Sequence, residues 1–234
     1  MKNIIVSEDI QEIQYEKFIE ELFNKIKRKN TQDDMLFISV TDDNGNLVAF
    51  LKPITFDYES IFPDCVHYIS KWRRENPSLS NSVFEVTDER TRNWLYKLIL
   101  NRKDRLLFLI DDLQNNHIGH IAYSSFDFQN KTAEIDAVLR GEKSPVPGIM
   151  TMTIKSMIRW AKNNLKLNNI QLRVNDNNEK AIALYKRCGF IAISRIPLFK
   201  RELDNEVRWD EDNSRDESEA ERFELLMRYE KGGF

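Results

Sequence analysis

Apolar residues near the start of the chain recur at helical spacing among charged ones. Ile13, Phe18 and Ile19 belong to this series, which predicts an amphipathic helix from Glu8 to Lys29. The basic residues at its end suit the negative end of the helix dipole. We expect this helix to pack on the protein or on a second copy of it. A calmodulin-like or membrane-binding helix is the less favoured interpretation.

Hydrophobic runs of strand length alternate with helical patterns over the rest of the chain. Two runs flank Asn44-Gly45, which tolerates positive φ and therefore predicts a hairpin. We divide the chain into an N-terminal extension, 1–46, and a main domain, 47–234. The predicted elements are, in order, strands at 36–41 and 47–53, a helix ending near 74–76, a helix that Asp88 can cap, strands at 106–111, 117–126 and 132–140, a helix at 149–165, a strand at 170–174, a helix ending at Gly189, and strands at 190–197 and 223–230.

The segment TAEIDAVLR alternates as a half-buried strand does. The alternation predicts one face with Ala133, Ile135, Ala137 and Leu139, and an opposite face with Glu134, Asp136 and Val138. In the preceding strand, Gly119 indicates a bulge or a close approach of backbone.

An acidic stretch separates the last two predicted strands. Between about 200 and 221 apolar residues are few and acids are many, which predicts an exposed insertion or a mobile loop. We expect the strand at 190–197 to pair with the strand at 223–230 across this insertion.

The composition is that of a globular protein, with 41% hydrophobic and 31% charged residues. A net charge of -3 provides no general attraction to nucleic acid or to a membrane. Cys65 and Cys188 are too few for a disulfide framework, and no histidines or cysteines stand at metal-ligand spacing. The N-terminus lacks the apolar core of a signal peptide. We therefore expect a cytoplasmic protein with no metal, no nucleic-acid partner and no membrane insertion.

A motif near the end of the chain carries a resemblance to a known family. Asn178-x-x-Ala181-x-x-x-Tyr185-x-x-x-Gly189-Phe190, after a strand and a polar turn, resembles the last βα unit of the GNAT superfamily of N-acetyltransferases. The resemblance implies a mixed, mostly antiparallel, twisted central sheet flanked by helices, here with an N-terminal helix-hairpin extension. It also implies acetyl-CoA as co-substrate. By itself, Tyr185 is more often a core aromatic.

The resemblance further implies roles for individual residues. The tyrosine of such proteins lies near the acetyl-CoA sulfur and often acts as general acid, which assigns that role to Tyr185. Their phosphate-binding loop matches Pro145 to Met150, but only Gly148 agrees with the family pattern, and two prolines remove amide donors. Lys143 and Arg140 can supply the missing positive charge. The candidate cofactor-binding residues are Val138, Leu139, Arg140, Gly148, Ile149, Met150, Thr151, Asn178 and Ala181.

The proton acceptor is the least defined of the catalytic groups. Glu134 and Asp136 are the first candidates, because a carboxylate partly shielded from water has a raised pKa suited to accepting a proton. Either can instead form a salt bridge or bind the ammonium of the acceptor. His120 and a chain of water molecules are the alternatives.

The acceptor is expected to be a primary amine on a small molecule. The pair Trp72-Arg73 and the segment RGEKSPVPGIM resemble the members of this family that acetylate nucleotide-linked amino sugars. Such a ligand needs cations for its diphosphate and an aromatic ring for its base, which Arg73, Arg74 and Trp72 can supply, although an arginine pair at a helix end is more often solvated surface. A protein N-terminus or another small amine is the alternative. A possible homodimer, and a non-catalytic binding or regulatory module of the same fold, also stay open.

Overall fold

The computed structural model describes residues 8–28 and 36–230, and the predicted helix end at Lys29 lies outside them. None of the helices in these ranges is long and apolar enough to cross a membrane. The elements are α1 Glu8–Lys27, β1 Ile38–Thr41, β2 Leu47–Pro53, α2 Tyr58–Ile61, α3 Cys65–Glu75, η2 Pro77–Leu79, β3 Ser82–Phe84, α4 Asp88–Trp94, η3 Leu95–Leu100, β4 Leu106–Asp112, β5 His117–Asp127, β6 Thr132–Arg140, α5 Ile149–Trp160, η4 Ala161–Leu165, β7 Asn169–Asn175, α6 Glu179–Arg187, β8 Phe190–Leu203, β9 Glu206–Asp210, η5 Glu217–Glu219 and β10 Arg222–Tyr229.

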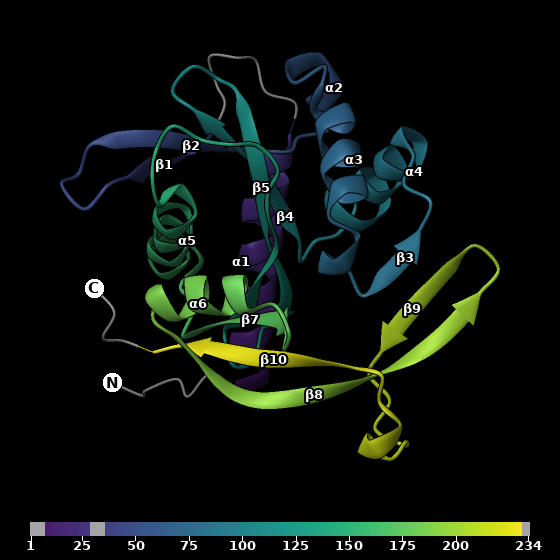
Figure 1. The fold of residues 1–234 in the computed structure, drawn as a ribbon. Coiled ribbons are helices and arrows are strands. Elements are labelled where there is room, and N and C mark those ends of the chain that lie inside the picture. Colours follow the sequence, from purple (N-terminus) through teal and green to yellow (C-terminus); the bar gives the residue numbers. More distant parts are fainter. Residues whose placement is uncertain (1–7, 29–35, 231–234) are drawn as a thin grey trace, which may run out of the picture.

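The strands form one sheet in the order β1-β2-β4-β5-β6-β7-β10-β8-β9-β3 (Figure 1). Among the described neighbours only β6 and β7 run parallel, and the other pairs are antiparallel. The Asn44-Gly45 hairpin joins β1 to β2 as predicted, with Gly45 at φ 86°. The prediction of a mixed, mostly antiparallel sheet flanked by helices, with an N-terminal helix, is confirmed.

Two hydrophobic cores lie on opposite faces of this sheet. On one face α1 and α5 pack with inward residues of β4 such as Phe108. On the other face α2, α3 and η3 pack with the alternate residues of β4, Leu107 and Leu109. β4 is buried along its whole length because helices cover both of its faces.

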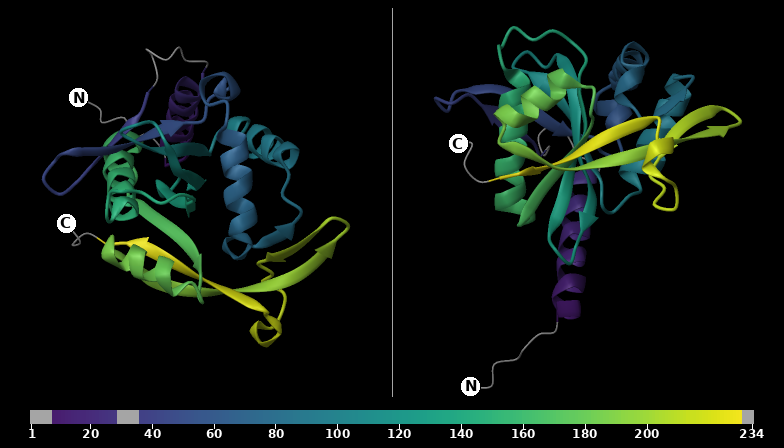
Figure 2. Two further views of the ribbon diagram at one scale, coloured as in Figure 1. Left: turned by 45° about the horizontal axis from the view of Figure 1, so that its top comes forward. Right: turned by 60° about the horizontal axis from the view of Figure 1, so that its bottom comes forward.

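The acidic region forms a structured arm at the end of the sheet (Figure 2). The predicted pairing of the last two strands is confirmed, since Phe190 pairs with Tyr229 and Pro197 with Phe223. Part of the predicted exposed insertion or mobile loop is strand, because β8 continues to Leu203 and turns back as β9, which pairs with β3. Most of the side chains between residues 200 and 221 are exposed. Cross-strand side chains explain how so polar a segment forms strands: they stack cations on aromatic rings and pair opposite charges.

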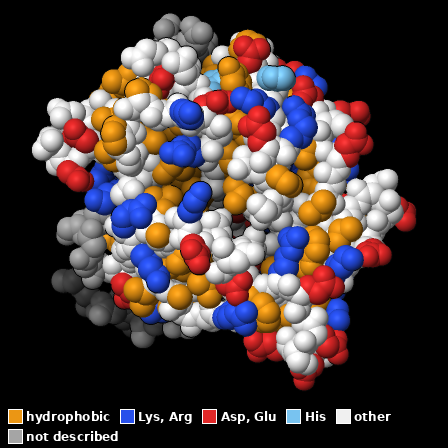
Figure 3. Space-filling model, viewed as in Figure 1, with side chains coloured by type: hydrophobic (Ala, Val, Ile, Leu, Met, Phe, Trp, Pro, Cys, Tyr) orange, Lys and Arg blue, Asp and Glu red, His pale blue; other side chains and the backbone are white. Residues whose placement is uncertain are grey.

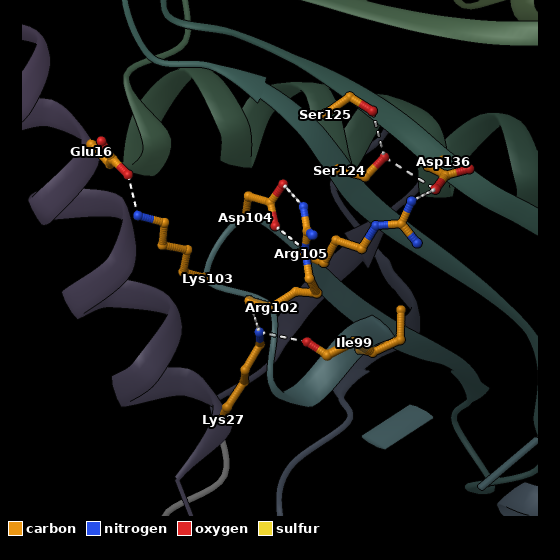
Figure 4. Close-up of polar contacts among 10 residues, drawn as sticks. All are labelled: Glu16, Lys27, Ile99, Arg102, Lys103, Asp104, Arg105, Ser124, Ser125 and Asp136. Atoms are coloured by element: carbon orange, nitrogen blue, oxygen red, sulfur yellow. Dashed lines mark hydrogen bonds and ion pairs between the residues drawn. The ribbon is translucent and has the colours of Figure 1, made fainter. Parts of the chain in front are cut away.

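The buried ammonium group of Lys27 attaches α1 to the end of η3. Lys27 is 1% exposed, and its Nζ donates to the backbone oxygens of Ile99 and Leu100 at 2.8 and 3.4 Å and also to that of Arg102 (Figure 4). These carbonyls lie at the end of η3 and just beyond it, where intrahelical donors run out, although the Ile99 oxygen also accepts from the Arg102 amide at 3.4 Å. Burial lowers the pKa of Lys27 to about 8. Lys103 on the following loop pairs with Glu16 of α1.

Replacing Lys27 with Ala is expected to lower the free energy of unfolding by about 3 kcal/mol, because it opens a cavity and leaves carbonyls without a donor. Chemical denaturation followed by circular dichroism measures this loss. Lys27→Met, which keeps the aliphatic stem, is expected to lose less. An alanine variant within 1 kcal/mol of the wild type, roughly the worth of one hydrogen bond, would contradict the anchoring role.

Candidate active site

A bulge interrupts β6 at Ala137, whose φ is 48°. The register of its pairing with β5 shifts there. Ala133 and Ile135 therefore pack with the α1 and α5 core, whereas Leu139 packs with the α3 core. The predicted alternation was wrong from Ala137 onward, because one extra residue moves the following side chains to the opposite face.

Gly119 on β5 lies directly against the strand that carries the bulge. A Cβ added at Gly119 would stand 2.1 Å from the backbone oxygen of Leu139. The close approach of backbone expected at this glycine is confirmed. A side chain there would push the two strands apart, so glycine is needed at this point.

β6 and β7 separate beyond a short parallel contact. They pair from Thr132 with Asn169 to Glu134 with Gln171, and a cleft of about 1070 Å³ opens beyond this contact. Figure 3 shows a hollow near the middle of this face with basic side chains around it. The cleft brings together the twelve residues proposed as first candidates for catalysis or acetyl-CoA binding, but not Lys143: Glu134, Asp136, Val138, Leu139, Arg140, Gly148, Ile149, Met150, Thr151, Asn178, Ala181 and Tyr185.

One end of the cleft is formed by the start of α5. Gly148 precedes this helix in the left-handed conformation, with φ 74°, and no side chain caps the helix. The amide of Thr151 donates to the Gly148 oxygen, so the orphan amides of the first turn are those of Ile149 and Met150. These two amides and the helix dipole suit an anion, as expected for a phosphate-binding end.

The α6 helix presents Tyr185 to the cleft. Asn178 caps this helix, since its Oδ1 accepts from the amide of Ala181 at 3.1 Å. Tyr185 is 5% exposed and packs edge-on against Phe190. Burial raises the pKa of Tyr185, and the charge of Asp136 raises it further. The phenol therefore keeps its proton at neutral pH and can donate it.

Asp136 stands beside the bulge with its charge near Tyr185. Its carboxylate accepts from the Ser124 hydroxyl at 3.1 Å and from the Ala137 amide at 2.6 Å. Arg105 approaches it at 3.7 Å, and Figure 4 shows the guanidinium pointing toward it. The Asp136 side chain is 40% exposed, so it can still reach a bound amine or a water molecule.

Glu134 is engaged in the sheet. Arg173 on β7 donates to its Oε1 at 3.1 Å and also pairs with Glu211. Burial raises the pKa of Glu134, and the positive charge of Arg173 opposes this rise. The ion pair leaves Glu134 less free than Asp136 to act on a ligand.

His120 turns one ring nitrogen toward a carbonyl and leaves the other without a partner. Its Nδ1 lies 2.7 Å from the oxygen of Ala137, so Nδ1 carries the hydrogen. Nε2 is buried and has no hydrogen-bond partner among the described residues. Burial lowers the pKa of His120 to about 4, and Arg73 adds to this effect. The imidazole is therefore neutral, with a free lone pair at the cleft.

Of the three residues expected to bind a nucleotide, only Arg73 reaches the cleft. Trp72 is fully buried and donates from Nε1 to Glu142 at 3.0 Å, so it offers no ring to a base. Arg74 donates to the oxygen of Val86 and lies outside the cleft lining. The roles expected for Trp72 and Arg74 were wrong, because the packing of α3 turns only Arg73 inward.

Sequence reasoning missed the segment that closes the far side of the cleft. Residues 76–84, through η2 and β3, cross from α3 toward β7 and β10. The Asn81 amide donates to Glu224 at 2.7 Å, and the Asn175 amide donates to the oxygen of Ser78 at 3.1 Å. β3 has only three residues, so no alternating pattern could have predicted it.

The chain belongs to the GNAT acetyltransferase family, because the model described as "Acetyltransferase (GNAT) domain" matches residues 50–191. The family and the fold define an acyltransferase domain of the N-acetyltransferase class. GNAT acetyltransferases use acetyl-CoA as co-substrate. The resemblance stated from the sequence is therefore confirmed at the level of the family.

The relatives are spermidine acetyltransferases. Spermidine N(1)-acetyltransferase of Vibrio cholerae is 27% identical over 97 residues, which are 42% of this chain and 56% of that protein. The match thus spans little more than half of the relative. Among solved structures, a point mutant of Vibrio cholerae spermidine N-acetyltransferase SpeG has a TM-score of 0.54 at 17% identity, covering 76% of this chain and 93% of that chain. A dodecameric structure of that enzyme has a TM-score of 0.50 at 17% identity, covering 71% and 87%. These structural similarities show the fold.

Proposed function

We propose that the chain transfers the acetyl group of acetyl-CoA directly to the primary amine of a small molecule bound in the cleft. One observation carries this proposal. The separation of β6 from β7 creates a single space bordered by the start of α5, by Tyr185 and by Asp136. An anion-binding helix end, a protonated phenol and an accessible carboxylate are the groups that acetyl transfer to an amine needs.

The proposed steps use these groups in turn. Asp136, directly or through water, takes a proton from the ammonium of the acceptor. The neutral amine then attacks the thioester carbonyl and forms the new C–N bond. As the C–S bond breaks, Tyr185 gives its proton to the departing sulfur, and coenzyme A leaves as the thiol. The nitrogen loses its second proton as the amide forms, and this proton restores the Tyr185 hydroxyl, directly or through water. Gly148, Ile149 and Met150 hold the pyrophosphate, and Val138, Leu139 and Arg140 line the path of the pantetheine arm.

The closed far side of the cleft favours a small acceptor over a protein N-terminus. The η2–β3 segment is joined to the β8–β9 arm through pairs such as Val83 with Val207. It is also joined to β7 and β10 by the hydrogen bonds of Asn175 and Asn81. A protein chain would have to displace these contacts to enter from that side. Small-molecule acceptors of the kind acetylated by the relatives need no such opening.

The identity of the amine is the finer part of the proposal. The nucleotide-linked amino sugar expected from the sequence keeps Arg73 as a contact for phosphate, but loses Trp72 as a contact for the base. Spermidine, named for the relatives, carries only positive charge. The possible homodimer also stays a prediction, and light scattering after gel filtration measures it.

The test is release of coenzyme A thiol from acetyl-CoA in the presence of spermidine, UDP- and dTDP-linked amino sugars, or a short peptide with a free N-terminus. Turnover of any small amine, with the acetylated product seen by mass spectrometry, supports the proposal. Turnover of the peptide alone would contradict a small-molecule acceptor and indicate that the acceptor is a protein N-terminus.

The altered phosphate loop supports an alternative function, in which the protein is a non-catalytic binding module. Pro145 stands where family members have a basic or amide residue, and Met150 where they have a small one. Isothermal titration with acetyl-CoA separates the two. Binding in the micromolar range, a typical range for enzyme substrates, supports the enzyme. Absence of binding at millimolar ligand would favour the module.

A further inference from the structure

Arg73 is a largely desolvated cation with no carboxylate beside it. Its guanidinium lies between the rings of Phe84 and Trp94, 5.0 Å from each centroid. Nη1 is buried without a hydrogen-bond partner, and no acidic group in the described parts of the chain pairs with Arg73. Burial lowers the pKa of Arg73, and the nearby Arg90 lowers it further. An arginine that is partly removed from water and has a buried Nη1 but no counterion is unusual in a folded protein, because its desolvation goes uncompensated.

Arg73 and Arg90 both lie near the Phe84 ring, but within the described residues only Arg90 has a counterion. Arg90 lies 4.5 Å from the Phe84 centroid and pairs with Glu206 at 3.7 Å. Arg90 therefore has both an aromatic neighbour and a counterion. Arg73 has two aromatic neighbours and an unused donor, and it lines the cleft. Contact with two rings restricts the guanidinium before a ligand binds, which reduces the entropy lost on binding.

His120 adds a second unused group at the same place. Its ring is buried, its Nε2 has no partner in the described structure, and its charge state responds to Arg73. The two unsatisfied nitrogens have opposite hydrogen-bonding character, since Arg73 donates and neutral His120 accepts at Nε2. Buried groups left unpaired in a cleft are explained when a ligand supplies the partners.

The charge around the cleft agrees with an anionic ligand group. Three acidic side chains line it, namely Glu134, Asp136 and Glu224. The basic side chains that line it are Arg73, Arg105, Arg140, Arg173, Lys180 and Arg187. In the proposed function the cations near α5 and α6 serve the coenzyme A phosphates, whereas Arg73 belongs to α3 and is left for the acceptor. A polyamine would meet repulsion there.

We infer that Arg73 and His120 form an acceptor subsite for an amine that also carries an anionic oxygen group, a carboxylate or a phosphate. Arg73 donates to the anionic oxygens, and Nε2 of His120 accepts from a nitrogen or hydroxyl of the same molecule. The inference rests on the proposed function, because it names the class of acceptor that the acetyl transfer uses.

The experiment compares kcat/KM for matched amines with and without the anionic group. The pairs are leucine with leucinamide, glucosamine 6-phosphate with glucosamine, and a UDP-linked amino sugar with the free sugar; spermidine is added as a polycation. The first pair tests a carboxylate and the others test a phosphate. We expect the anionic member of at least one pair to be preferred. Arg73→Gln is expected to lower kcat/KM for that member by about 10- to 100-fold, as for loss of a charge-assisted hydrogen bond, with the KM for acetyl-CoA unchanged.

Arg74→Gln is the matched control, because it removes a neighbouring arginine of the same helix that lies outside the cleft lining. Arg73→Lys keeps the charge without the planar donor and is expected to fall between Arg73→Gln and the wild type. An unchanged melting temperature and acetyl-CoA affinity show that the variants are folded.

The outcomes distinguish failure of the proposed Arg73–His120 subsite from failure of the proposed acetyl transfer. Turnover of amines with no preference for an anionic member, or a preference that survives Arg73→Gln, would overturn the subsite alone. Absence of turnover of every amine would overturn the proposed function and the subsite with it.

Discussion

Tyr185→Phe is expected to lower kcat by roughly 10- to 10⁴-fold, the range for loss of a general acid. The substitution removes only the hydroxyl, and the ring keeps its packing against Phe190. Because burial and the charge of Asp136 raise the pKa of Tyr185, the phenol holds its proton throughout the neutral range. Without this proton the sulfur must leave as a thiolate. The KM for acetyl-CoA is expected to change little, and steady-state kinetics measures both constants.

Tyr15→Phe is the control for the tyrosine variant. Tyr15 is also buried, but its hydroxyl donates to the oxygen of Leu165 at 2.7 Å, on the α1 side of the core. Its removal is expected to cost about 1 kcal/mol of stability with no change in kcat. Wild-type turnover by Tyr185→Phe would remove Tyr185 from the mechanism.

Asp136→Asn is expected to lower kcat by about 10²- to 10⁴-fold, the range for loss of a general base. The amide keeps the size of the side chain and can still accept from Ser124 and Ala137, so the change affects proton transfer more than structure. The acetyl-CoA affinity is expected to stay the same. Steady-state measurement of thiol release gives both kcat and the KM for acetyl-CoA of the variant.

Glu134→Gln is the matched comparison on the same strand. Glu134 already pairs with Arg173, so its neutralisation is expected to change kcat by less than about fivefold and to affect mainly the local ion pair. A large loss in Glu134→Gln with normal turnover in Asp136→Asn would exchange the two roles. Normal turnover in both variants would leave His120 or a water chain as the proton acceptor.

The elements with strong local signals were predictable. Asn178 caps α6, the Asn44-Gly45 turn forms a hairpin, and β8 pairs with β10 across the acidic segment. Each depends on short-range chemistry, such as a side-chain cap, a positive φ or an alternating hydrophobic pattern. A local pattern of the same kind, from Asn178 to Phe190, carried the resemblance to the family, and the family match confirms the family.

The features that shape the cleft had weaker signals or none. The bulge at Ala137 reverses the faces of β6 without any change in the pattern of residue types. β3 is too short to show a period, and its partner β9 lies in a segment whose composition resembles a disordered loop. Both features depend on contacts between residues far apart in the chain, and one sequence does not display such contacts.

The sequence by itself determined the family, the order of most elements and twelve residues that line the cleft. Only the tertiary structure decided the α3 side of the cleft. Trp72, Arg73 and Arg74 follow one another on one helix, where successive side chains point about 100° apart. The docking of α3 on the sheet buries the first, turns the second into the cleft and leaves the third outside, because the direction of each side chain depends on what the helix packs against.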